Sequence, residues 1–338
     1  MSVGYHYSRV EELGINVKIL NIKSSRGFEH YSQFFPKEAI IHPARFNIFL
    51  IDYLVDNYTK PRDVILDPMA GVGTLGVVAS LKGRNVIQVE VEPKFFNFME
   101  EARRRVTELH TLTSKGWIVN ILGDARELSK LVREKVDHVI TSPPYAECKK
   151  ARELSREDVE KLARRWEQFR KDTWNTWGKS AHTEGRLRAF FTLGGYPDNP
   201  NQIGLLKTGN LHKIDNIINN PSKTHNIEEI RSYLMEGGKP TYLSEMLRVY
   251  HEMYKVLKPK GLAIIVIKSF IRNWKPIDLP WYTYCLCRIV GFKLREVLKY
   301  RLTFKSFWRI LHERKYRERG LEYPDILNYE YVLIFSKS

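Results

Sequence analysis

The sequence is poor in cysteine and has no long hydrophobic run. Its three cysteines, Cys148, Cys285 and Cys287, provide no disulfide framework and fall short of a four-thiolate zinc site, so no metal is expected. The longest apolar run, Leu262 to Ile267, is far shorter than a membrane-spanning helix. The N-terminus has neither an apolar signal core nor the composition of a transit peptide. These absences predict a cytoplasmic protein without a membrane partner.

The composition is that of a folded protein with an excess of basic residues. Hydrophobic residues make up 43% and aromatic residues 12% of the 338 positions, which excludes a disordered chain. The formal net charge is +16, and the excess is uneven, because residues 288–319 contain eleven Lys and Arg against three Glu. Such a charge favours a polyanionic partner.

Apolar strand-like runs alternate with amphipathic helical segments in the first part of the chain. The expected strands are 63–66, 85–91, 117–122, 136–141 and 261–268. Strands that alternate with helices in this way predict an α/β fold with a parallel, doubly wound sheet. Residues 292–300 and 329–336 are typical of an antiparallel pair that completes such a sheet.

The alternation breaks over residues 146–239, which are rich in Gly, Pro and Asn towards their end. We interpret this segment as an inserted subdomain on the substrate side of a core formed by residues 37–145 and 240–338. Residues 1–36 form an N-terminal extension whose role the sequence does not indicate.

A glycine turn and three acidic residues predict a cofactor site. Gly71, Gly73 and Gly76 have the spacing G-x-G-x-x-G, which by itself is weak evidence for dinucleotide binding. Asp67, Glu90 and Asp124 lie at the ends of three successive expected strands, and parallel strands place such residues at one sheet edge. Carboxylates suit the cationic cofactor S-adenosylmethionine better than NAD, which requires a pyrophosphate site. Alternatively, an acid in such a position caps a helix.

The stretch Val136 to Tyr145, VDHVITSPPY, predicts the catalytic loop. Two consecutive prolines end the strand and present Ser142, the Pro143 carbonyl and the Tyr145 ring at the sheet edge. A ring and two acceptor oxygens suit a flat heteroaromatic amine. The alternative is a proline-terminated strand followed by a buried tyrosine. A second apolar run that ends in Asn-Pro, residues 214–222, lacks the second proline and the aromatic ring.

These motifs together resemble those of the amino-methyltransferase family, which methylates N4 of cytosine or N6 of adenine in nucleic acids. DPMAGVGT is similar to the cofactor motif, VEVEP to the ribose motif, GDA to the adenine motif and TSPPY to the catalytic motif. Met69 and Val72 depart from the family pattern at positions of packing. The resemblance implies a Rossmann-like, seven-stranded methyltransferase sheet with an inserted subdomain. It also implies the catalytic residues Ser142, Pro143, Pro144 and Tyr145 and the cofactor-binding residues His42, Asp67, Met69, Ala70, Gly71, Gly73, Thr74, Glu90, Asp124, Ala125 and Thr141.

The basic segment near the C-terminus mixes cations with aromatic rings, as expected where single-stranded or looped RNA is held. The candidate nucleic-acid-binding residues are Arg301, Lys305, Trp308, Arg309, Arg314, Lys315 and Arg317. The alternative is a solvated basic helix. Serine at the first catalytic position favours cytosine N4, and the overall pattern is similar to that of archaeal small-subunit ribosomal RNA cytidine-N4 methyltransferases. A roomy pocket would allow dimethylation.

Three other functions remain open at this point. A DNA N4-cytosine or N6-adenine methyltransferase would carry the same motifs. A nicotinamide-dependent oxidoreductase would explain the glycine turn but would leave TSPPY without a role. A catalytically silent RNA-binding protein could retain the fold.

Overall fold

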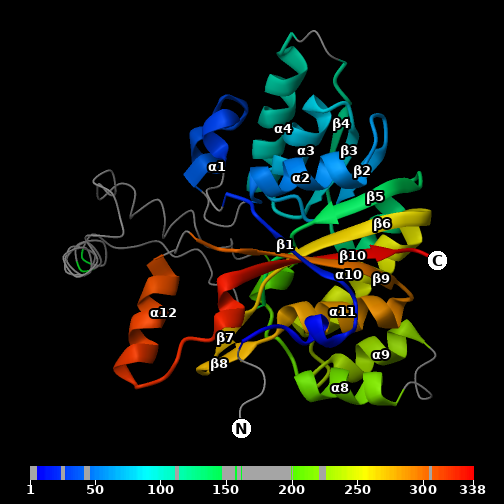
Figure 1. Cartoon of the computed structure of the whole chain (residues 1–338). Helices are drawn as coiled ribbons and strands as arrows, with labels where there is room; N and C mark the ends of the chain where they lie inside the picture. Colours follow the sequence, from blue (N-terminus) through cyan, green and yellow to red (C-terminus); the bar gives the residue numbers. More distant parts are fainter. Residues whose placement is uncertain are drawn as a thin grey trace.

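The computed structural model describes residues 6–23, 27–41, 46–110, 114–146, 201–220, 226–303 and 307–338, together with Glu157, Lys161 and Asn199. Its centre is an eight-stranded sheet (Figure 1). The strands of this sheet are β1 (Val17–Leu20), β2 (Val64–Asp67), β3 (Asn85–Glu90), β4 (Ile118–Leu122), β5 (Val136–Thr141), β6 (Leu257–Ile267), β9 (Lys293–Arg301) and β10 (Tyr329–Ser336). A separate hairpin consists of β7 (Phe270–Arg272) and β8 (Lys275–Ile277).

The order of the strands is β1-β9-β10-β6-β5-β2-β3-β4, and only β10 runs antiparallel to its neighbours. The predicted α/β sheet and its final antiparallel pair are therefore confirmed. From β2 the chain continues to β3 and β4 on one side, and later returns to β5 and β6 on the other. This reversal places a crevice at the carboxyl ends of β2 and β5, where doubly wound sheets bind ligands.

Helices cover both faces of the sheet (Figure 1). The main helices are α1 (Lys37–Ile41), α2 (Ile48–Tyr58), α3 (Thr74–Leu81), α4 (Pro93–Glu108), α5 (Leu128–Leu131), α8 (Leu211–Asn219), α9 (Ile227–Leu234), α10 (Tyr242–Val256), α11 (Leu279–Val290) and α12 (Phe307–Glu318). The buried residues of α2, α3 and α4 form one hydrophobic cluster, and those of α5, α10 and α11 form a second cluster on the other face. None of the helices in the described ranges is long and apolar enough to cross a membrane.

The eighth strand, β1, comes from the N-terminal segment and was not predicted. It pairs in parallel with β9 at the edge of the sheet. Ser8 and the backbone amide of Arg9 donate hydrogen bonds to the Asp278 carboxylate at 2.6 and 2.8 Å. The Glu11 carboxylate accepts from the Tyr331 hydroxyl at 2.6 Å. The described part of this segment is therefore packed into the same core as the sheet.

The described part of the inserted segment includes α8 and α9, which pack against α10 and α11. Ile214 and Ile217 of α8 are buried and belong to the cluster that contains α10. The apolar run that ends in Asn-Pro thus forms a helix, whereas the run that ends in TSPPY forms the central strand β5. The fold supports TSPPY as the loop at the crevice.

Candidate active site

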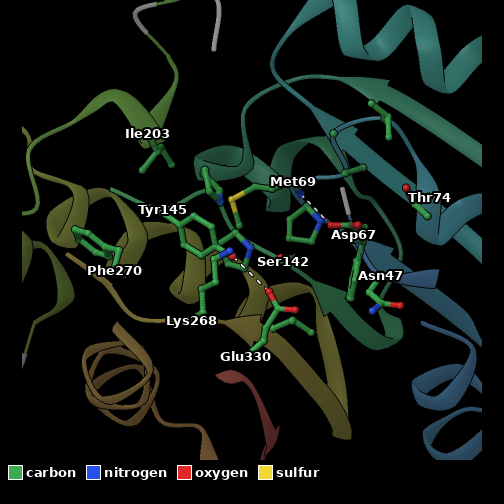
Figure 2. Close-up of a pocket in the computed structure, with 18 of the residues that line it drawn as sticks. Asn47, Asp67, Met69, Thr74, Ser142, Tyr145, Ile203, Lys268, Phe270 and Glu330 are labelled. Carbon is green, nitrogen blue, oxygen red and sulfur yellow. Dashed lines mark hydrogen bonds between the residues drawn. The ribbon is translucent and has the colours of Figure 1, made fainter. Parts of the chain in front are cut away.

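A pocket of about 560 Å³ opens at the carboxyl ends of the central strands. Figure 2 shows Asp67 and Thr74 on one side of this pocket and Tyr145, Lys268 and Glu330 on the other. The predicted site residues that line it are Asp67, Met69, Ala70, Gly71, Thr74, Glu90, Asp124, Ala125, Ser142, Pro143, Pro144, Tyr145 and Arg309. The structure thus brings the expected cofactor and catalytic segments into one cavity.

The remaining predicted cofactor residues lie beside the pocket or outside the described part of the chain. Gly73 forms the backbone turn behind the pocket wall, and Thr141 is buried at the end of β5. His42 lies outside the described residues. Phe46 and Asn47, which follow it closely, line the pocket.

The glycine turn joins β2 to α3. Gly73 is the N-cap of α3 and has a φ of 79°, a left-handed conformation that favours glycine. Gly76 lies where a Cβ atom would come within 2.6 Å of the Gln88 side chain, so a larger residue here would displace the Gln88 amide that accepts from the Gly76 backbone. The Gly71 amide donates to the Glu90 carboxylate at 2.8 Å. The turn therefore connects the end of β2 to the acid at the end of β3.

Asp67 and Glu90 are buried carboxylates at neighbouring strand ends, with exposed fractions of 3% and 7%. Burial raises the pKa of Asp67 to about 7, although the Thr141 hydroxyl and the Met69 amide partly oppose this. Burial likewise raises the pKa of Glu90 to about 7. The groups that oppose these shifts are uncharged hydrogen-bond donors, which at Glu90 are the Glu92 and Gly71 amides. A positively charged ligand in the pocket would favour the ionised form of Asp67, which fits the cationic methionine end of S-adenosylmethionine, and an ionised Glu90 can accept hydrogen bonds from ribose hydroxyls.

Asp124 has different surroundings, because it is held by the side chain two residues further on. Its carboxylate caps a short 3-10 helix through the Arg126 amide at 2.9 Å and pairs with the Arg126 guanidinium at 2.6 Å. Arg126 also pairs with Glu245, which in turn pairs with Arg231 of α9. Burial alone would raise the pKa of Glu245, but hydrogen bonds from both arginines outweigh it and lower the pKa. The capping role foreseen as an alternative is present here, and a contact with an adenine amine stays a prediction.

The TSPPY loop follows β5 and is fixed by a residue from a distant helix. The hydroxyl of Tyr242, the first residue of α10, donates to the Pro144 carbonyl at 2.9 Å. The proline rings restrict φ at positions 143 and 144, and Tyr242 fixes the next peptide. Together these constraints set the direction of the Pro143 carbonyl, which is the expected amine acceptor.

Residues from β6, β9 and β10 surround Tyr145 and were not predicted. The Tyr145 hydroxyl donates to the Glu330 carboxylate at 3.4 Å, and the Lys268 ammonium lies 4.9 Å from the centre of the Tyr145 ring. The Tyr300 hydroxyl also donates to Glu330. The Lys268 ammonium thus lies over the Tyr145 ring. Lys268 is the last residue of a predicted strand, 261–268, and directly follows β6 in the structure, so the rule that found the three acids at strand ends could have found it.

We expect Tyr242→Phe to lower kcat about tenfold, because the lost hydrogen bond allows the Pro143–Pro144 backbone to move. Affinity for S-adenosylmethionine should be unchanged, since Tyr242 does not line the cofactor side. Steady-state methyl transfer and calorimetric cofactor binding would measure the two effects. Tyr250→Phe is the matched control, because Tyr250 is equally buried on α10 but its hydroxyl is hydrogen-bonded to Thr283 and not to the TSPPY loop. Equal kcat losses in both variants would mean that the effect is general destabilisation.

The candidate nucleic-acid-binding residues lie in several environments. Arg309 lines the pocket and donates to the Leu302 carbonyl at 2.9 Å. Arg314 pairs with Glu318 at 2.8 Å on the outer side of α12. Arg301 lies at the end of β9, and Lys315 and Arg317 lie on α12. Lys305 and the side chain of Trp308 are outside the described part of the chain.

The sheet order, with one antiparallel strand beside β6 and the cofactor turn after β2, defines the Rossmann-like fold of S-adenosylmethionine-dependent methyltransferases. In its fold and its glycine turn the chain is similar to this class. Within the class, residues 17–101 match the N6/N4 methyltransferase family model, which is described as "DNA methylase". This match includes the glycine turn and Glu90 but ends before Asp124 and TSPPY.

Curated relatives match short parts of the chain. The type II methyltransferase M.HinfI of Haemophilus influenzae is 46% identical over 48 residues, which cover 14% of this chain and 13% of that protein. The tRNA (guanine(10)-N2)-dimethyltransferase of Methanothermobacter thermautotrophicus is 31% identical over 119 residues, which cover 35% of this chain and 33% of that protein. The chain thus spans at most about a third of these relatives.

Solved structures of methyltransferases also align with the chain. TrmN from Thermus thermophilus aligns with 90% of this chain and 52% of its own, at 14% identity and a TM-score of 0.40.

Proposed function

We propose that the protein transfers a methyl group from S-adenosylmethionine to the exocyclic N4 amine of a cytidine in RNA. The proposal rests on one observation: the acids Asp67 and Glu90 line the same pocket as the TSPPY loop. The finer proposal is a cytidine of small-subunit ribosomal RNA, with one or two methyl groups added.

Ser142 and the Pro143 carbonyl prepare the amine for reaction. The lone pair of an exocyclic amine is delocalised into the base, so the nitrogen must become pyramidal before it can attack. Ser142 Oγ and the Pro143 carbonyl oxygen would each accept one N–H, which favours the pyramidal nitrogen through fixed dipoles. S-adenosylmethionine bound next to them would supply an electrophilic methyl group. The new N–C bond would replace the methyl C–S bond, the thioether product would leave, and one amine proton would go to solvent.

Tyr145 would hold the unstacked base. Base–aromatic stacking contributes about 1–3 kcal/mol per base. The Lys268 ammonium behind the ring and Glu330 at its hydroxyl fix the orientation of the ring. On the cofactor side, Asp67 and the Gly71–Gly73 turn would hold the methionine end, and Glu90 the ribose.

DNA is the alternative substrate, and the family description "DNA methylase" and the type II relatives favour it. The basic α12 beside the pocket and the tRNA-modifying relative favour RNA. The catalytic geometry serves either polymer, because both present the same amine.

Nucleoside mass spectrometry of total RNA and DNA from a strain that lacks the gene would test the proposal. We expect loss of N4-methylated cytidine from RNA, restored by the wild-type gene and not by the Ser142→Ala variant. Loss of a methylated base from DNA alone would establish the alternative. Unchanged nucleosides in both polymers would contradict both.

A further inference from the structure

A second cavity, of about 400 Å³, lies next to the pocket between the end of β9 and helix α12. Its walls are Arg301, Leu302, Thr303, Arg309, Glu313, Arg317, Leu321, Tyr323 and Asn328. Three of these nine residues are arginines and one is an acid. A cavity with this lining is suited to an anion.

The two cavities share a wall. Leu302, Arg309 and Tyr323 line both of them. A ligand that places a flat ring against Tyr145 could therefore continue past Arg309 into the second cavity without leaving the protein surface.

Arg309 is the charged part of this wall. Its side chain is 10% exposed, and its guanidinium contacts the Leu302 carbonyl, the Asn328 amide oxygen and, at 3.6 Å, the Glu313 carboxylate. Burial lowers the pKa of Arg309, and the nearby acids only partly oppose this. A ligand with a negative charge on the cavity side would stabilise the buried cation.

Arg301 and Arg317 supply the remaining positive charge. Arg301 is exposed and lies 3.8 Å from Asp325 at the rim. In the described part of the chain, no carboxylate pairs with the exposed Arg317 guanidinium. Even with Glu313 and Asp325 both counted, the three arginines leave the cavity net positive.

We propose that the second cavity binds a backbone phosphate next to the target nucleotide while the base occupies the pocket. The inference rests on the proposed function and makes it more specific: the substrate is a polynucleotide held by its phosphodiester backbone, and a free nucleoside is a poor substrate. Arg301, Arg309 and Arg317 contact the phosphate, whereas Arg314 of the same helix, which lines neither cavity, does not.

Binding of a fluorescein-labelled single-stranded RNA with one cytidine, measured by anisotropy at several salt concentrations, tests the proposal. We expect Arg301→Gln and Arg317→Gln each to weaken binding about tenfold. Each should also reduce the slope of log K against log salt by about 0.7, the value for one lost phosphate contact on a single strand. Arg317→Lys should retain most of the affinity, because lysine also binds phosphate.

Two further variants control for general charge. Arg314→Gln removes the same charge from the same helix, and we expect a smaller loss with no change of slope. Arg133→Gln removes it from an exposed position just before β5, at the end of that strand opposite to Ser142, and should leave binding unchanged. Cofactor affinity and thermal stability, measured for every variant, would identify a misfolded one.

The outcomes separate this inference from the proposed function. If Arg301→Gln and Arg317→Gln keep the wild-type slope while the wild-type protein methylates RNA, the phosphate site is wrong and the function stands. If the slopes change but no methyl group is transferred to RNA or DNA, the site stands and the function is wrong. Equal turnover of free cytidine and of the oligonucleotide would contradict the phosphate site directly.

Discussion

Replacement of Ser142 by alanine is expected to lower kcat about 100-fold. Ser142 directly follows β5, and its hydroxyl lines the pocket beside the fixed Pro143–Pro144 backbone. Removal of one preorganised group that stabilises developing charge typically costs a factor of about 100 to 1,000 in kcat. Because the hydroxyl would accept the hydrogen bond from the amine N–H mainly in the transition state, kcat should fall while the Kd for S-adenosylmethionine stays the same.

Ser142→Asn provides the control, because its side-chain oxygen keeps an acceptor at the position. Asparagine also occurs at this position in the motif that TSPPY resembles. We expect Ser142→Asn to retain at least ten times the kcat of Ser142→Ala in a methyl-transfer assay. An alanine variant with wild-type kcat, or an asparagine variant as inactive as alanine, would show that the oxygen does not act on the amine.

The strand ends were predictable because each depends on short-range sequence signals. Asp67 follows an apolar run and precedes a proline and three small residues, so the end of the strand and the turn can both be read locally. In the structure residues of the DPMAGVGT and TSPPY segments line one pocket, because parallel strands bring their carboxyl ends to one edge. The proximity of the two segments follows from the parallel topology and does not depend on any particular pair of contacting residues.

The partners of the catalytic loop could not be predicted in the same way. Tyr242 is 98 residues from Pro144, and Glu330 is 185 residues from Tyr145. Their positions depend on how α10 and β10 pack against β5 and β6, and no local pattern encodes that packing. β1 was missed for another reason: it has four residues, of which only Leu20 is buried, so it lacks the alternation that identifies a strand.

The sequence predicted the position of Asp124 but not the side chains around it. The strand-end pattern placed it in the pocket, and it lies there. The sequence did not indicate that Arg126 would fold back onto it and connect it, through Glu245, to helix α9. The Asp124 side of the pocket is therefore tied to helix α9 of the inserted segment.

Asp67→Asn is expected to stabilise the ligand-free protein at pH 8 and to impair cofactor binding. Burial raises the pKa of Asp67 from an ordinary value of 3.8 to about 7. Between about pH 4 and pH 7 the folded state therefore holds a proton that the unfolded state has released. The free energy of unfolding of the wild type therefore contains a contribution that is complete below about pH 4 and is lost as the pH rises through 7. Asparagine has no charge to bury and avoids that loss.

The expected stability difference between Asp67→Asn and wild type is roughly 3 kcal/mol greater at pH 8 than at pH 4.5, since one pKa unit corresponds to about 1.4 kcal/mol. Chemical denaturation of both proteins at the two pH values measures it. Comparison with the wild type is necessary because burial lowers the pKa of His138 and His251, and these groups change stability in the opposite direction. A difference that does not depend on pH would contradict the buried, protonated Asp67.

Cofactor binding should reveal the function of this buried acid. If Asp67 faces the cationic methionine end of S-adenosylmethionine, the ligand favours the ionised carboxylate, and its affinity for the wild type should rise about tenfold between pH 6 and pH 8. Asp67→Asn should bind weakly and with a flatter pH profile. Any pH dependence that remains in this variant comes from titration of the ligand and of other groups, and it is subtracted from the wild-type profile. Calorimetric titration at each pH measures both. A variant that is more stable than the wild type and binds the cofactor equally well would show that the carboxylate is not part of the cofactor site. The expected loss of cofactor affinity would mean that the protein keeps an unfavourable buried charge in order to bind its ligand.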